Sequence, residues 1–76
     1  MYQYYILEVQ KSKEGEYSHT VHYAWDADPD VARRKAESQY HTVVAAAAVS
    51  DTAMHSAVLV SAEGFPIMNQ CYINDK

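Results

Sequence analysis

The stretch YQYYILEV, from Tyr2 to Val9, would place apolar side chains on both faces of a β-sheet. Alternate side chains of a strand point to opposite faces, so this stretch divides into two rows. The rows are Tyr2, Tyr4 and Ile6 on one face, and Tyr5, Leu7 and Val9 on the other. A strand that is apolar on both faces is typical of the middle of a sheet. The question for function is therefore what covers each face.

A hairpin is predicted to join this first strand, Tyr2 to Lys11, to a second strand. The intervening residues, Ser12 to Glu16, are polar and include Gly15, which can adopt the positive φ that a hairpin loop requires. The second strand, YSHTVHYAW, alternates with a period of two, which indicates a half-buried strand. Its more aromatic face carries Tyr17, His19, Val21, Tyr23 and Trp25. We expect Val21, Tyr23 and Trp25 to pack beneath a helix.

A long helix is predicted to start near Asp28 and to stop near Ser50 and Asp51. Asp28 can cap the helix, Pro29 suits its first position and Asp30 complements its dipole. An apolar stripe recurs at spacings of three and four residues, which predicts a face packed against a core. The stripe consists of Ala32, Ala36, Tyr40, Val43 and Ala47. The alanines at positions 45 to 48 favour helix and allow close approach to a sheet.

A second hairpin is predicted after the helix. Two short apolar runs, His55 to Ala62 and Pro66 to Ile73, are joined by Glu63 and Gly64 as a tight turn. Pro66 has no N–H for a neighbouring strand, so it marks the start of the last strand or places that strand at a sheet edge.

The expected fold is a single α+β domain, residues 1–76, with the element order ββαββ. One helix of about 20 residues can cover one face of a four-stranded antiparallel sheet. The first and third strands are apolar on both sides, so we expect them in the middle, in the strand order 2-1-3-4. The alternative places strands two and three side by side and parallel, through a right-handed crossover.

Charge and composition disfavour two classes of partner. Six Lys and Arg against ten Asp and Glu give a net charge of −4, which disfavours non-specific binding to nucleic acid. The basic run from Arg33 to Lys35 is flanked by acids, so we interpret it as a solvated helix face. No stretch has the roughly 18 apolar residues of a membrane span, and the start of the chain lacks signal-peptide features. We expect a cytoplasmic protein with no membrane partner.

One acidic pattern imitates a calcium-binding loop. Asp26, Asp28, Asp30 and Glu37 have the spacing of the acids in such a loop, but Val31 stands where its sharp turn needs glycine. We interpret these acids as part of a helix start, with Asp28 as the cap.

The histidines and the one cysteine give no recognisable metal or catalytic motif. His19 and His22 are three residues apart on a strand, so they face opposite sides and cannot share a metal directly. A cross-strand site that combines His19, His55 and Cys71 is the arrangement left open. We expect Cys71 to be a small core residue rather than a nucleophile, and we predict no metal, no cofactor and no catalytic residue.

The leading functional hypothesis is a non-enzymatic protein-interaction module that forms a homodimer through its open sheet face. Tyrosines mixed with aliphatic residues are typical of interaction surfaces, and a second copy could stack on the sheet about 10 Å away. A heterologous protein is the other partner that such a face would suit. The candidate residues for the interaction face are Tyr2, Tyr4, Tyr5, Ile6, Leu7 and Tyr23.

Two alternatives belong to other classes. The first is a small-ligand-binding protein or an enzyme with a pocket at the subunit interface, for which His19, His22 and His55 are the polar pocket candidates. The second is a single-stranded nucleic-acid binder whose aromatic second strand stacks bases, which would need more positive charge than this chain carries nearby.

Three segments carry a resemblance to other proteins. YYILEVQ near the start, KAESQYH in the helix and GFPIMNQCYI near the end resemble small uncharacterised proteins encoded by bacteriophages and integrated mobile elements. The resemblance implies an accessory factor that binds host or phage components, and it assigns no site residue.

Overall fold

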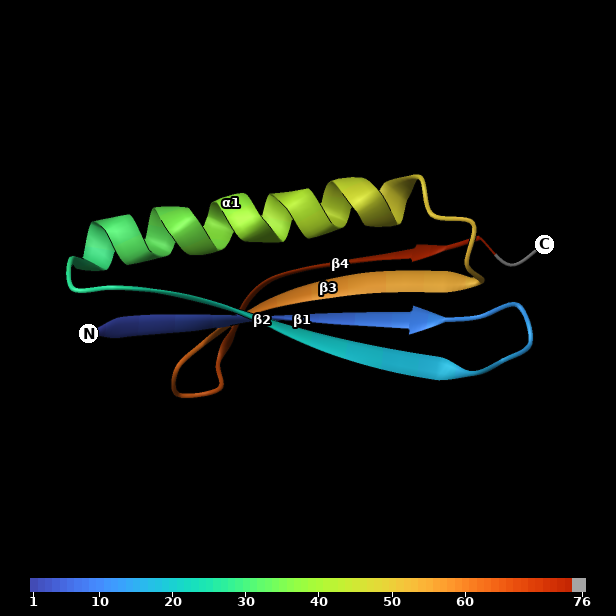
Figure 1. The fold of residues 1–76 in the computed structure, drawn as a ribbon, viewed down its shortest axis with the longest axis horizontal. Helices are drawn as coiled ribbons and strands as arrows, with labels where there is room; N and C mark the ends of the chain where they lie inside the picture. Colours follow the sequence, from blue (N-terminus) through green and yellow to red (C-terminus); the bar gives the residue numbers. More distant parts are fainter. Residues whose placement is uncertain (75–76) are drawn as a thin grey trace.

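The computed structural model describes residues 1–74 and confirms the predicted α+β fold with the element order ββαββ (Figure 1). The strands pair in the order β2-β1-β3-β4, and every neighbouring pair is antiparallel, as predicted. The elements are β1 (Tyr2–Lys11), β2 (Tyr17–Asp26), α1 (Pro29–Ala48), β3 (Met54–Ser61) and β4 (Pro66–Ile73). The strand order 2-1-3-4 is therefore correct, and the parallel alternative is not formed.

Both hairpins close through the same turn geometry. The Ser12 N–H donates to the Glu16 carbonyl over 2.8 Å, and the Gly15 N–H donates back to the Ser12 carbonyl. Gly15 adopts a φ of 93°, a backbone angle that residues with a Cβ atom rarely adopt. Gly64 repeats this φ in the second turn. The glycines in the two predicted turns therefore fix where each hairpin reverses.

The helix begins as the sequence predicts and ends slightly earlier. The Asp28 carboxylate accepts hydrogen bonds from the N–H groups of Asp30 and Val31, at 2.8 and 3.1 Å, which is the geometry of an N-cap. The last helical residue is Ala48, because the Val49 and Ser50 N–H groups donate to the Ala46 and Ala47 carbonyls, respectively, three residues back instead of four. The buried helix residues are the predicted stripe of Ala32, Ala36, Tyr40, Val43 and Ala47.

The helix covers the face of the sheet that carries Ile6, so the predicted packing of the aromatic row of β2 beneath the helix is wrong. The core beneath α1 contains Ile6, Ala24, Ala57 and Leu59, in contact with Ala36, Tyr40 and Val43 of the helix. Val21, Tyr23 and Trp25 point to the opposite face and are exposed, so they do not pack beneath the helix. Ala24 of β2 and Ala57 of β3 lie beneath the helix. Three of the five buried helix residues are alanines, so the helix must lie close to the sheet for their short side chains to contact the core.

Within residues 1–74, no helix is long and apolar enough to cross a membrane.

Candidate interaction surface

The face of the sheet opposite α1 has no covering element within residues 1–74 (Figure 1). The register places alternate residues of all four strands on this open face. Its apolar residues are Tyr5, Leu7 and Val9 of β1; Tyr17, Val21, Tyr23 and Trp25 of β2; Met54, Val58 and Val60 of β3; and Cys71 and Ile73 of β4. We call this set of residues the open face.

The edges of the open face expose large aromatic side chains. Trp25 is 54% exposed, Tyr23 is 51% exposed and Tyr17 is 60% exposed. The Tyr5 and Tyr23 rings meet edge to face, with 5.4 Å between their centroids, so neighbouring strands hold these rings in a fixed arrangement. Exposed aromatic side chains held rigidly are typical of binding surfaces, since little conformational entropy is lost when a partner covers them.

The open face is almost free of charge. Its strand residues include one formally charged side chain, Lys11, whose ammonium lies 5.6 Å from the centre of the Tyr17 ring. The net charge of −4 is therefore carried elsewhere on the molecule. An uncharged centre costs little to desolvate when another surface covers it.

The structure divides the predicted interface residues between the two faces. Tyr5, Leu7 and Tyr23 lie on the open face. Tyr2, Tyr4 and Ile6 share the helix-covered face: Ile6 is fully buried and Tyr4 packs against the core, while Tyr2 is half exposed at the strand end. Of the predicted β1 candidates, only the odd-numbered residues remain available to a partner on the open face. Ile6 is fully buried beneath α1 and offers no surface to a partner.

Cys71 also lies on the open face, and the expectation that it is a core residue is wrong. The thiol is exposed because β4 is an edge strand and Cys71, like Asn69 and Ile73, points away from α1. His19 is exposed on the same face, whereas His55 is buried on the other, so the cross-strand set of His19, His55 and Cys71 does not converge.

A second group of polar side chains lies on the helix-covered face, where Glu8 joins two of the predicted pocket histidines. The Glu8 carboxylate is 2.9 Å from His22 Nε2 through one oxygen and 2.6 Å from His55 Nε2 through the other. An ionised carboxylate only accepts hydrogen bonds, so both imidazoles donate from Nε2. We call these three residues the Glu8 cluster.

The Glu8 cluster is largely shielded from water. The His55 and Glu8 side chains are 5% and 15% exposed, and His22 is 27% exposed. Burial alone would raise the pKa of Glu8, but the hydrogen bonds and charges of His22 and His55 outweigh burial and hold that pKa below its ordinary value. Glu8 therefore stays ionised at neutral pH and fixes both rings.

The Glu8 cluster has the geometry of a structural network rather than of a reactive site. Its three residues come from β1, β2 and β3, so the cluster ties three adjacent strands together. Within residues 1–74, no group of three His, Cys, Asp or Glu side chains is arranged to hold a metal ion. The buried His55 Nδ1 has no hydrogen-bond partner among the described residues. Sequence reasoning missed Glu8, although a carboxylate in an apolar strand row requires a buried partner.

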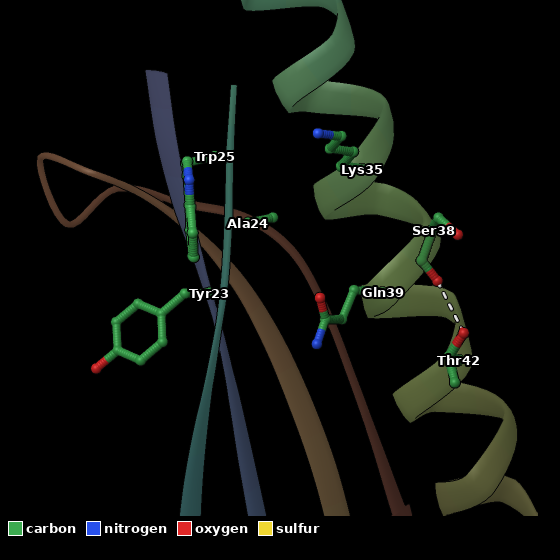
Figure 2. A pocket seen from close by; sticks show the side chains of 7 residues that line it. All are labelled: Tyr23, Ala24, Trp25, Lys35, Ser38, Gln39 and Thr42. Carbon is green, nitrogen blue, oxygen red and sulfur yellow. Dashed lines mark hydrogen bonds between the residues drawn. The ribbon is translucent and has the colours of Figure 1, made fainter. Parts of the chain in front are cut away.

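A groove of 590 Å³ runs along the outer side of β2 (Figure 2). On one side lie the rings of Tyr23 and Trp25, and on the other lie polar side chains of α1. The residues that line it are Tyr23, Ala24, Trp25, Lys35, Ser38, Gln39 and Thr42.

Two of the three cations in the basic run next to this groove are paired with acids. Lys35 Nζ is 2.8 Å from an Asp26 carboxylate oxygen, and Arg33 is 2.7 Å from Glu37 one helical turn away. These pairs agree with the prediction of a solvated helix face rather than a nucleic-acid footprint.

Comparison of this chain with protein-family models, curated protein sequences and solved structures gives no match. The functional argument therefore rests on the open face, the Glu8 cluster and the groove.

Proposed function

We propose that this chain is a small non-enzymatic protein-interaction module that forms a homodimer through its open face. The observation that supports the proposal is an apolar sheet face, with exposed aromatic rings at one edge, that α1 leaves uncovered. Contiguous apolar surface of this kind is rare on monomers and marks interaction sites. A cytoplasmic accessory role, as the resemblance to proteins of phages and mobile elements implies, belongs to the same proposal.

A second copy suits the open face for two reasons. Two sheets that pack face to face about 10 Å apart form a shared core, which gives a short chain more buried apolar area than it has alone. The face carries one cation at its border and no anion among its strand residues, so two copies meet without opposed like charges at the centre. A twofold axis then brings the same patch of each copy into contact.

The nucleic-acid alternative has one observation in its favour. Tyr17, His19, Tyr23 and Trp25 lie together on an uncovered sheet face, where aromatic rings can stack bases. Lys11 is the one cation among the strand residues of that face, however, and binding to a phosphate backbone draws much of its affinity from several cations. The proposal therefore favours a protein surface as the occupant.

The test is the solution mass across a concentration series, measured by size-exclusion chromatography with light scattering. Leu7→Lys places a charge in the middle of the open face, and Ala45→Lys places the same charge on the exposed side of α1 as the matched control. We expect Leu7→Lys to abolish the contact made through the open face and to stay folded by circular dichroism. Ala45→Lys should keep the wild-type mass.

A wild-type protein that stays monomeric at all concentrations would contradict the homodimer. In that case, salt-sensitive binding of a single-stranded oligonucleotide, followed by Trp25 fluorescence, would support the nucleic-acid alternative instead.

A further inference from the structure

The outer edge of β2 is a second surface with unpaired bonding groups. β2 is the first strand in the order β2-β1-β3-β4, and its ten residues pair with β1 in an unbroken register. Because the Ser12 and Glu16 pair is hydrogen-bonded, and such pairs recur at every second residue, the even-numbered residues of β2 bond to β1. The N–H and C=O groups of its odd-numbered residues therefore point outward, away from the sheet.

The two edges of the sheet differ in how they are protected. β4, the other edge strand, begins at Pro66, which has no N–H, and its register shifts at Leu59 and Val60. Proline and irregular register are features that prevent an edge from pairing with another strand. β2 has no proline and no register shift, and its one formally charged residue is Asp26 at its end. The β2 edge is thus the one left open to pairing.

The groove beside β2 defines what can pair there. A strand added to this edge would place one row of side chains beside Tyr23 and Trp25, and the other row beside Ser38, Gln39 and Thr42 of α1 (Figure 2). The first row should therefore be apolar or aromatic, and the second should be small or polar.

We propose that the occupant of the β2 edge is β2 of a second copy of this chain, paired antiparallel. β2 itself has the required pattern: its odd-numbered row is aromatic and aliphatic, and its even-numbered row begins with Ser18, Thr20 and His22. Antiparallel pairing of odd with odd residues keeps both helices on the same side and joins the two open faces into one sheet.

Charge is compatible with this pairing. In an antiparallel pair of β2 strands the two Asp26 residues lie at opposite ends, and each is already held by its own Lys35 at 2.8 Å. Within the ten residues of β2, no like charges oppose each other across the joint. This contact uses main-chain groups at an edge and does not depend on the open-face dimer. If both contacts form and their twofold axes intersect at right angles, the assembly closes as a tetramer with D₂ symmetry.

The decisive experiment is amide hydrogen exchange by NMR across a concentration series. The amides of Val21 and Tyr23 point outward and exchange quickly in a monomer, so we expect their exchange to slow by more than about tenfold as the β2 edges pair. The amides of Thr20 and His22 bond to β1 and should be protected at every concentration, which makes them the internal control. Exchange of Val21 and Tyr23 that is independent of concentration would overturn the proposal.

Repeating the measurement in the Leu7→Lys variant separates the two contacts. Concentration-dependent protection that persists in Leu7→Lys supports edge pairing, whatever happens to the open face. Protection that disappears in Leu7→Lys assigns it to the open-face dimer and overturns edge pairing.

A main-chain substitution gives a second test. Val21→Pro removes one outward N–H without removing a hydrogen bond to β1, and Val21→Ala controls for the lost side chain. We expect Val21→Pro to show half the largest mass that Val21→Ala shows by light scattering, because both variants lose the valine side chain from the open face. An unchanged mass in a folded Val21→Pro variant would contradict the proposal, and the exchange experiment decides if that variant does not fold.

Discussion

Glu8 shows how one buried carboxylate can set the register of a small sheet. It lies on the central strand β1 and accepts hydrogen bonds from His22 on one side and His55 on the other. A slip of β1 by one residue would move Glu8 to the open face and leave both imidazoles unpaired. Because an unpaired buried polar group is costly, the Glu8 cluster favours one register over its neighbours.

Replacing this carboxylate should destabilise the fold. Glu8→Gln removes the negative charge that both imidazole N–H groups approach, and the amide can accept from only one of them. We expect the free energy of unfolding in urea to fall by about 1.5–3 kcal/mol, the range for hydrogen bonds to charged groups. Glu63→Gln, in the exposed turn between β3 and β4, should change it by less than about 0.5 kcal/mol. Equal effects of the two substitutions would show that the Glu8 cluster contributes no stability.

The same carboxylate should make stability depend on pH. The folded protein holds the pKa of Glu8 below its ordinary value of 4.5, so the unfolded chain binds the proton more readily. The stabilisation is therefore fully present above the unfolded pKa and is lost as pH falls through the lower folded pKa. The difference in unfolding free energy between wild type and Glu8→Gln, measured in urea, should therefore begin to shrink as pH falls below about 4.5. A difference that is constant from neutral pH into acid would contradict this linkage.

At the scale of single elements, local signals in the sequence were sufficient to predict the type and place of each element. The cap at Asp28, the stripe that includes Tyr40 and the glycine turns predicted the helix and both hairpins, because each signal acts within a few residues. The helix ends at Ala48, slightly before the predicted end. No glycine follows the helix, so the sequence has no local signal that marks its last residue. Partners that lie far apart in the sequence, such as Glu8 and His55, had no local signal and became visible only in the folded sheet.

The helix start can be tested through its cap. Asp28→Ala removes the oxygen that accepts from the Asp30 and Val31 N–H groups, so we expect a loss of about 1 kcal/mol of stability. Asp28→Asn keeps a capping oxygen and should retain most of it. Thermal unfolding followed by circular dichroism measures both. Similar losses in the two variants would attribute the effect to charge rather than to the cap.

The alanine stripe sets how closely the helix approaches the sheet. Ala36 is fully buried against the core, so Ala36→Leu should overpack the interface and cost about 1–3 kcal/mol. Ala45→Leu makes the same change on the exposed side of the same helix and should be nearly neutral. Urea unfolding of the pair isolates the packing effect, because helix propensity changes equally in both. A stable Ala36→Leu variant would mean that the helix can move away from the sheet at little cost.

At the scale of the whole molecule, the sequence predicted that both faces of the sheet carry apolar residues and that one helix can cover only one of them. It did not predict which face the helix covers. Both rows of β1 are apolar, so β1 gives no preference. The preference comes from packing volume. Ala24 and Ala57 on one face leave room for a close helix, whereas Tyr23 and Trp25 fill the other face. The size of side chains on neighbouring strands, read together, is the signal that could have identified the covered face.

The uncovered face holds the chain's one tryptophan, which gives the molecule its own reporter of assembly. Trp25 is 54% exposed in the single chain, so its ring is in contact with water there. Burial of this ring by a second open face should move its fluorescence emission to shorter wavelength as the protein concentration rises. Leu7→Lys should lose the part of this shift that the open-face contact causes, and Ala45→Lys should follow the wild type. A shift that persists in Leu7→Lys would mean that Trp25 is covered through the β2 edge, since Trp25 lies both on the open face and beside that edge.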